Sequence, residues 1–148
     1  MHDTLLLLHA AATLYMVGLI WMVQLVHYPL IAFVGHGSLA EWQAANLPRT
    51  TWAVGPPMLL ELATTVLLVV IQPAAVPGWA SVLGAILLGV IWVSTALVQV
   101  PLHDAILRAD PSEARAAVHR LVRSNWARTV LWSMRGLLAL VFLGRAMG

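Results

Sequence analysis

The chain contains no cysteine and no lysine, and only 9% of its 148 residues are charged. Without cysteine it can form neither a disulfide framework nor a thiolate metal site. A soluble domain usually carries about 25% charged residues, whereas 61% of this chain is hydrophobic. The composition therefore predicts an integral membrane protein. The basic residues are all arginines and do not alternate with aromatic residues, so we expect no nucleic-acid partner.

Four apolar stretches are long enough to cross about 30 Å of hydrocarbon. They predict a single all-α membrane domain over 1–148, an antiparallel bundle of four transmembrane helices with short interfacial helices. The predicted transmembrane helices cover about 4–33, 53–71, 79–100 and 125–144. The polar connection over 35–52 predicts a short interfacial helix over 39–47, with Ser38 as its N-cap and Glu41 at the third position.

The arginines are distributed unequally between the two sides of this bundle. The first and third connections hold Arg49, Arg108, Arg115, Arg120, Arg123 and Arg128, and the other side holds only Arg145. The positive-inside rule then places both connections in the cytoplasm and both termini outside. We expect the chain to lie in a bacterial inner membrane with lipids as neighbours, and a homo-oligomer is compatible with its sequence.

The start of the last helix combines polar and aromatic residues at helical spacing. Asn125, Arg128, Trp132 and Arg135 fall at i, i+3, i+7 and i+10, which is a single helix face. An arginine at mid-membrane costs at least about 2.5 kcal/mol to insert unless it finds water or a partner. We therefore expect this face to point into the bundle, with Trp132 facing a cavity. Trp92, inside the third helix, is interpreted as a packing residue.

The other helices carry polar residues at the same end of the bundle. These are Gln24, His27 and Tyr28 near the end of the first helix, Glu61 about two turns into the second, and Gln99 and His103 at the end of the third. Polar groups at membrane depth are costly and mark functional sites. The pattern predicts a cavity near the cytoplasmic interface, lined by polar side chains and able to take a lipophilic small molecule.

Several of these residues allow more than one interpretation. Glu61 and Arg135 lie at matching depths and can form a structural ion pair or take part in binding. His27 and His103 can be acid–base groups or interfacial hydrogen-bonding residues, or can bind non-haem iron together with Glu61 or haem as a histidine pair. No H-x-x-x-H or E-x-x-H spacing occurs within a helix, so no metal is predicted.

Three segments of the second half resemble a known family. They are the run from Val98 to Leu107, the pair Asp110-Pro111, and the run from Asn125 to Thr129. Together they are similar to the small four-helix membrane family that includes the anthrone oxygenases, whose members carry P-L-N-x-x-L, a short acidic loop and W-N-x-x-R-T. Here His103 stands where that pattern has asparagine, and the order of asparagine and tryptophan is reversed.

This resemblance implies an oxygenase that converts an anthrone to an anthraquinone without a bound metal or flavin. A base would remove an activated C–H proton, and the resulting anion would react with dioxygen. The implied catalytic residues are His27 or His103 as the base and Arg128 with Asn125 as oxyanion stabilisers. Substrate contacts are expected from Gln24, Tyr28, Glu61, Gln99, Trp132 and Arg135.

Two other classes of function remain open at this point. The helix that contains His9 bears a fainter likeness to bacterial protoporphyrinogen oxidases, which implies a haem or metal redox protein, although those proteins use a lysine and this chain has none. The third class is a non-catalytic membrane subunit or lipid-binding module. In that class, the Glu61–Arg135 pair would be structural and the basic segment would bind anionic headgroups.

Overall fold

The structure is a computed structural model that describes residues 2–31, 33–108 and 110–148. All regular elements in these ranges are helical. They are α1 (His2–Met22), the π-helix η1 (Val23–His27), α2 (Tyr28–Ile31), the 3₁₀ turn η2 (His36–Ser38), α3 (Leu39–Ile71), α4 (Gly78–Ser94), the π-helix η3 (Thr95–Gln99), α5 (Val100–Arg108) and α6 (Pro111–Met147).

Four continuous helical segments are long and apolar enough to cross a membrane, namely 2–31, 39–71, 78–108 and 112–147. Their outward faces carry large apolar side chains. Leu7, Val70 and Leu97, for example, are 59%, 74% and 72% exposed. Leaving such side chains in water would forfeit the free energy of burying them, whereas lipid accepts them. The chain is therefore a membrane protein.

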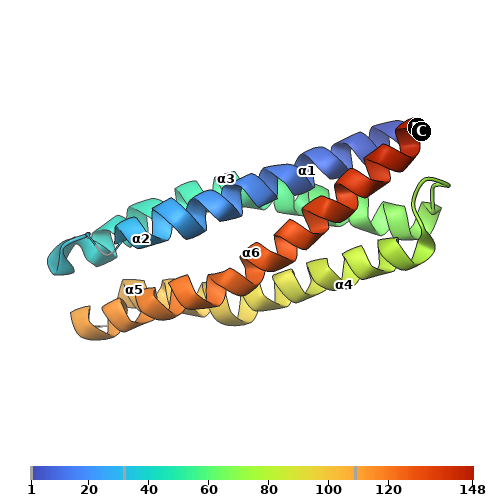
Figure 1. The fold of residues 1–148 in the computed structure, drawn as a ribbon. Coiled ribbons are helices and arrows are strands. Elements are labelled where there is room, and N and C mark those ends of the chain that lie inside the picture. Colours follow the sequence, from blue (N-terminus) through green and yellow to red (C-terminus); the bar gives the residue numbers. More distant parts are fainter. Residues whose placement is uncertain (1, 32, 109) are drawn as a thin grey trace.

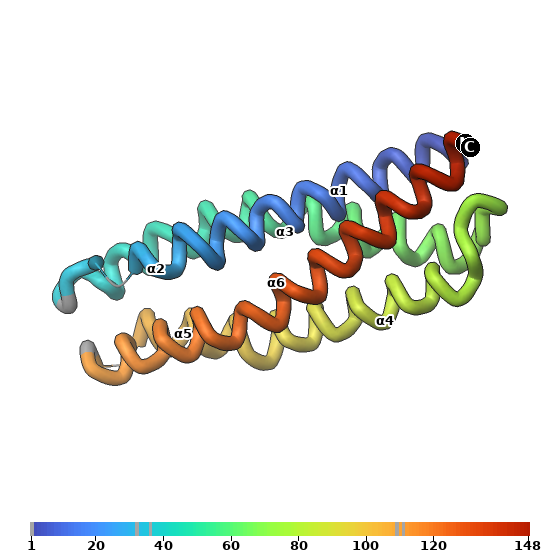
Figure 2. The backbone as a smooth tube through the Cα atoms, in the orientation of Figure 1, coloured from blue at the N-terminus to red at the C-terminus, as the bar shows by residue number. Residues whose placement is uncertain are grey.

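The four segments lie side by side along one long axis, and the chain reverses direction at each connection (Figure 1). Both termini lie at one end of the bundle, and α2, α5 and the start of α6 lie at the other. Helix α6 crosses the bundle obliquely, from α5 at one end to α1 at the other (Figure 2). This oblique path brings α6 against α1, α4 and α5, and two side chains of its inward face, Trp132 and Arg135, reach Glu61 on α3.

Two of the predicted transmembrane helices are continuous with the helical turns before them. Helix α3 starts at Leu39, so the predicted interfacial helix and the predicted second helix form one element that passes through Pro48, Pro56 and Pro57. Ser38 is its N-cap residue but makes no side-chain capping bond. The early turns of α3 are held by burial instead, because Leu39 and Gln43 are 2% and 0% exposed. Helix α6 begins at Pro111 with Asp110 as its N-cap residue, as the run Asp110-Pro111-Ser112-Glu113 predicts, and continues unbroken through the predicted fourth span.

Three buried apolar clusters hold the bundle along its length. One joins α2, α5 and the starts of α3 and α6. A second, near the termini, joins α1, α3, α4 and α6. A third lies between them around Met16, Ile91 and Trp132. Near the third cluster, α1 and α6 approach closely at Gly136, where an added Cβ would lie 2.9 Å from Val17 Cγ2. A larger residue there would force the Val17 side chain or the two helices to shift.

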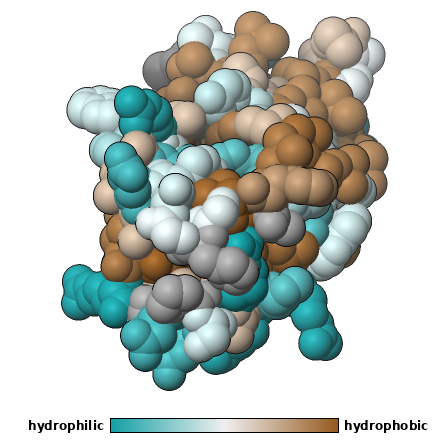
Figure 3. Space-filling view, turned by 90° about the vertical axis from the view of Figure 1, so that its left-hand side faces the viewer, coloured by the Kyte–Doolittle hydropathy of each residue, from teal (hydrophilic) through white to brown (hydrophobic). Residues whose placement is uncertain are grey.

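The end of the bundle opposite the termini carries many hydrophilic side chains. In the view onto this end they gather along one side and the lower edge, and hydrophobic side chains cover the opposite flank (Figure 3). The cavity described next lies between this end and the middle of the bundle, where α1, α3, α5 and α6 surround it.

Candidate functional site

A cavity of ≈ 350 Å³ lies among the four segments, within the size range of small-molecule sites. Much of its wall is apolar. The apolar wall residues include Met16, Ile20, Val54, Met58, Leu59 and Val100, and the polar ones include His27, Tyr28, Asn46, Thr50, Gln99, His103 and Arg128. Of the residues predicted for a site, His27, Tyr28, Gln99, His103 and Arg128 therefore share one cavity, and they come from three of the four segments.

The predicted inward face of α6 is buried in full. Asn125, Arg128, Trp132 and Arg135 are 0%, 6%, 0% and 2% exposed. Only Arg128 among them lines the cavity. Asn125 and Trp132 lie behind it, and Arg135 lies further along the bundle toward the termini.

The guanidinium of Arg128 is held by neutral groups. Its Nη1 donates to Asn125 Oδ1 at 3.1 Å, and its Cζ lies 5.1 Å from the centroid of the Trp132 ring, a cation–π contact. Asn125 in turn donates to Gln24 Oε1 at 2.9 Å, and Gln24 donates to the carbonyl of Val122. Gln24 and Asn125 thus position Arg128 without lining the cavity.

No carboxylate lies within ion-pairing distance of Arg128 in the described part of the chain. Its Nε also lacks a hydrogen-bond partner there. A buried cation without an anionic partner is costly in a region of low dielectric. Arg128 therefore gives the cavity an uncompensated positive charge, which favours a ligand with a negative or strongly polar oxygen.

The two cavity histidines differ in their hydrogen bonds. Gln43 Nε2 lies 2.7 Å from His103 Nδ1, so one ring nitrogen of His103 is engaged in a hydrogen bond. His27 makes no side-chain hydrogen bond with the described residues and contacts the rings of Tyr28 and Trp42, with centroids 5.9 Å and 5.4 Å away. A neutral His27 thus has an imidazole nitrogen free to accept a proton.

His27 also borders a second hollow. This hollow, ≈ 310 Å³ in volume, is lined by His27, Leu30, Trp42, Ala45, Asn46 and Arg49. His27 and Asn46 line both spaces, so they form part of the wall between them. Arg49 is exposed and donates to the carbonyl of Ala45. His27 therefore lies between the cavity and a hollow that is bordered by the exposed Arg49.

The Glu61–Arg135 pair lies outside the cavity and is fully hydrogen bonded. Arg135 Nε donates to Glu61 Oε1 at 2.9 Å, and Trp132 Nε1 donates to Glu61 Oε2 at 3.0 Å. The other nitrogens of Arg135 donate to Thr65 Oγ1 at 2.9 Å and to the carbonyl of Gly84. This arrangement joins α3, α4 and α6, which matches the structural interpretation of the pair.

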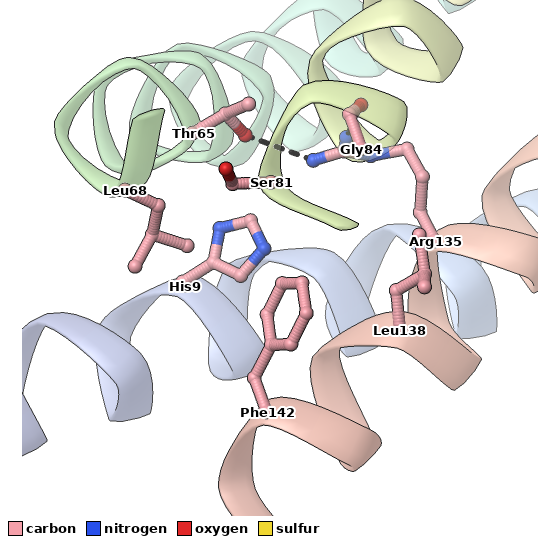
Figure 4. Close-up of a pocket in the computed structure, with 8 residues that line it drawn as sticks. All are labelled: His9, Thr65, Leu68, Ser81, Gly84, Arg135, Leu138 and Phe142. Carbon is pink, nitrogen blue, oxygen red and sulfur yellow. Dashed lines mark hydrogen bonds between the residues drawn. The ribbon is translucent and has the colours of Figure 1, made fainter. Parts of the chain in front are cut away.

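Beyond Arg135, a hollow of only ≈ 10 Å³ separates it from His9 (Figure 4). That volume is about one water molecule and far below that of a porphyrin. His9 Nδ1 lies 3.1 Å from Thr64 Oγ1, and its ring stacks on Phe142 with centroids 6.4 Å apart. His9 is therefore a hydrogen-bonded interior residue.

The three side chains considered as iron ligands, His27, His103 and Glu61, do not line one common space. Both carboxylate oxygens of Glu61 are bound to Arg135 and Trp132, and Glu61 does not line the cavity with His27 and His103. Within the described ranges, no three histidine, aspartate or glutamate side chains are grouped closely enough to hold a metal ion.

Several features of the site have no clear signal in the sequence. Gln43, which fixes His103, is fully buried although its segment was expected at the interface. Trp92, expected to be a packing residue, lines the cavity. The π-helices η1 and η3 each bring two side chains to the wall, Val23 with His27 and Thr95 with Gln99. π-Helical turns are frequent at functional sites, and their wider turn redirects the side chains that follow.

No protein-family model matches the chain, and no curated protein sequence or solved structure is significantly similar to it.

Proposed function

We propose that this protein is a small membrane enzyme that binds a lipophilic aromatic molecule in the cavity and oxygenates it, as an anthrone oxygenase does. The observation that carries the proposal is the buried Arg128 guanidinium, which has no carboxylate partner among the described residues and lies at a largely apolar cavity. An apolar wall favours a lipophilic ring system. An unpaired cation favours a ligand whose oxygen becomes negatively charged during the reaction.

The proposed topology is an antiparallel four-transmembrane bundle in a bacterial inner membrane, with both termini outside. Its support is the excess of arginine in the first and third connections. At 1.5 Å per residue, the 33 residues of α3 span about 50 Å and exceed the hydrocarbon thickness. The first turns of α3 would then lie in the cytoplasmic headgroup region as the interfacial part of the helix, and the cavity would lie next to it.

The proposed route of the substrate is lateral, from the bilayer. Leu59 on α3 and Val100 on α5 line the cavity and are nevertheless 60% and 51% exposed on the outer surface. Both lie within membrane-spanning segments, so their exposed surface faces lipid. A ligand dissolved in the membrane would reach Arg128 between these two helices without passing through water.

In the proposed reaction, His27 removes a proton from a CH₂ group that is flanked by aromatic rings and conjugated to a ketone. The negative charge of the resulting anion rests on the ketone oxygen, which Arg128 stabilises. The carbanion carbon reacts with dioxygen to form a C–O bond, and protonation gives a hydroperoxide. Loss of the remaining hydrogen from that carbon and cleavage of the O–O bond give a second ketone and one water. Dioxygen is the only oxidant, and one molecule is consumed per turnover.

The test measures anthrone oxidation by the purified protein in nanodiscs, following quinone absorbance and dioxygen uptake against protein-free nanodiscs. We expect His27→Ala to lower kcat by about 10²- to 10⁴-fold, the usual contribution of a general base. We expect Arg128→Met to lower it by about 10²- to 10³-fold, as loss of an oxyanion donor does. His119→Ala and Arg120→Met alter exposed residues of α6 and should retain the rate. Equal rates with and without protein would refute the proposal.

A further inference from the structure

The second hollow, ≈ 310 Å³ in volume, is separate from the proposed reaction and has its own set of polar residues. It lies between the segment of η1 and α2 and the first half of α3, at the end of the bundle opposite the termini (Figure 1). Three of its wall residues, Trp42, Asn46 and Arg49, fall at i, i+4 and i+7 and share one face of α3. This face brings an aromatic ring, an amide and a cation to one side of the hollow.

The polar groups of this wall are hydrogen-bond donors. Arg49 Nη1 donates to the carbonyl of Ala45, and its other guanidinium nitrogens make no bond with the described residues. Asn46 Oδ1 accepts from Thr50 Oγ1 at 3.2 Å, so the amide nitrogen of Asn46 is left to donate. The ring N–H of a neutral His27 is a further donor. The hollow therefore offers N–H groups, while the two acceptors beside them are already bonded.

Arg49 gives the hollow a positive charge that no acidic side chain neutralises. Among the described residues, no aspartate or glutamate lines the hollow, and the ion pair found there joins Glu61 to Arg135 instead. A guanidinium matches the oxygens of a phosphate group and binds them through charge-assisted hydrogen bonds. This donor set therefore fits a phosphate.

The depth of Arg49 in the membrane indicates that this phosphate belongs to a lipid. About 20 residues of helix span 30 Å of hydrocarbon, so the part of α3 that ends at Ile71 reaches the opposite interface near Trp52. Trp52 is 79% exposed, as expected for a tryptophan at a membrane interface. Arg49 precedes it by less than one helical turn and thus lies at the level of the headgroups. Leu30, which is 56% exposed and belongs to the first membrane-spanning segment, borders the same hollow.

We propose that this hollow binds the headgroup of an anionic phospholipid from the leaflet at this end of the bundle. The lipid phosphate accepts hydrogen bonds from Arg49 and Asn46, and an acyl chain lies against Leu30. A zwitterionic lipid fits less well, because its ammonium group finds no carboxylate among the described wall residues. Since His27 and Asn46 also line the cavity, the bound headgroup covers the outer side of the wall between the two spaces.

The first experiment compares two lipids with the same acyl chains, dioleoylphosphatidylglycerol and dioleoylphosphatidylcholine. The full chain in a neutral detergent is titrated with each lipid, and bound lipid is counted by native mass spectrometry. We expect the wild type to bind one phosphatidylglycerol at least about 5-fold more tightly than phosphatidylcholine, the usual effect of one arginine near an anionic headgroup. Arg49→Gln should abolish this preference. Arg120→Gln, which removes an exposed charge of α6 outside the hollow, should keep it.

The second experiment fills the hollow without changing any charge. Ala45→Phe adds a ring at an exposed wall residue and should lower the affinity for phosphatidylglycerol to that of Arg49→Gln. Ala44→Phe makes the same change at the neighbouring exposed residue, which does not line the hollow, and should bind like the wild type. The helical circular dichroism of both variants should match that of the wild type, because neither position is buried.

Three outcomes would overturn the proposal. Equal affinity of the wild type for both lipids would show that the hollow does not select an anionic headgroup. Equal losses in Arg120→Gln and Arg49→Gln, or no loss in Ala45→Phe, would mean that the basic end of the bundle attracts anionic lipid in general. Displacement of the lipid by excess inorganic phosphate would identify a soluble phosphate as the ligand instead. These measurements involve no turnover, so their results are independent of the proposed oxygenation.

Discussion

The indole nitrogen of Trp132 donates to Glu61 Oε2 at 3.0 Å, while Arg135 binds the other oxygen of the same carboxylate. The ring of the same Trp132 packs against the guanidinium of Arg128. Trp132 therefore connects a neutralised ion pair on one side with an unpaired cation on the other. This division separates the residues that hold the bundle together from those available to a ligand.

The ion pair predicts a stability effect that depends on which partner is removed. Glu61→Leu leaves Arg135 buried without its anion and should destabilise the fold by about 3–5 kcal/mol. The double variant Glu61→Leu with Arg135→Met removes both charges and should recover most of this loss, because an uncharged pair needs no compensation. Unfolding in mixed micelles with increasing denaturing detergent measures both. Glu113→Gln, on the exposed first turn of α6, is the control, and additive losses in the double variant would contradict the prediction.

The contact between α1 and α6 predicts a steric effect at a single glycine. Gly136→Ala places a methyl group 2.9 Å from Val17 Cγ2 and should cost about 1–3 kcal/mol through overpacking. Combining it with Val17→Ala removes the clashing methyl groups and should restore stability. Gly144→Ala, on the same helix with no atom within 4 Å of the new Cβ, should be neutral or stabilising. Thermal unfolding measures these stabilities. A Gly136→Ala variant as stable as the wild type would contradict the prediction and show that the two helices can move apart at little cost.

Helical periodicity predicted the inward face of α6 well, because Asn125, Arg128, Trp132 and Arg135 are spaced for one side of a helix and are all buried. Periodicity cannot say which of these residues meet the cavity. That depends on the oblique crossing of α6, which buries Trp132 and Arg135 in contacts with α3 and turns Arg128 toward the cavity.

The cavity residues on the other helices were harder to predict. A π-helical turn changes the side-chain register locally, so the i, i+4 relation of Gln99 and His103 in a regular helix does not fix their directions across the junction of η3 and α5. Gln43 is polar and precedes the predicted second span, and only its packing against α5 makes it the partner of His103. Such residues are recognised from contacts between helices, which no single-helix pattern contains.

Because neutral side chains hold Arg128, a carboxylate placed beside it should affect stability and ligand binding differently. Asn125→Asp replaces the acceptor at 3.1 Å from Arg128 Nη1 with a carboxylate, which would neutralise the cation. We expect the thermal midpoint to hold, because the ion pair gained by the buried arginine offsets the loss of the hydrogen bond that Asn125 Nδ2 donates to Gln24 Oε1. Affinity for a phenolate or enolate ligand should fall by about tenfold or more, because that ligand no longer meets an unpaired charge. Asn125→Ala, which loses the support without adding charge, is the comparison. A parallel fall in stability and affinity in Asn125→Asp would mean that Arg128 is held for structural reasons alone.

The cavity itself can be filled from Gly55 on α3. This residue lines the wall, and a Cβ added to it meets no atom within 4 Å. Gly55→Leu should therefore leave the fold intact, and the helix can gain about 0.5–1 kcal/mol because glycine is a poor helix former. The leucine side chain would occupy space that a ring system needs, so the affinity for tricyclic ligands should fall much more than for a single-ring phenol.

Gly55→Ala provides the graded comparison, since one methyl group takes little of the ≈ 350 Å³. Gly18→Leu is the matched control, at an exposed helical glycine of α1 that also has no atom within 4 Å of its Cβ and does not line the cavity. Affinities for the two sizes of ligand and thermal midpoints of all four proteins separate occlusion from misfolding. Equal affinity of the wild type and Gly55→Leu for the tricyclic ligand would place its binding site outside this cavity. The unpaired charge of Arg128 would then need a different partner.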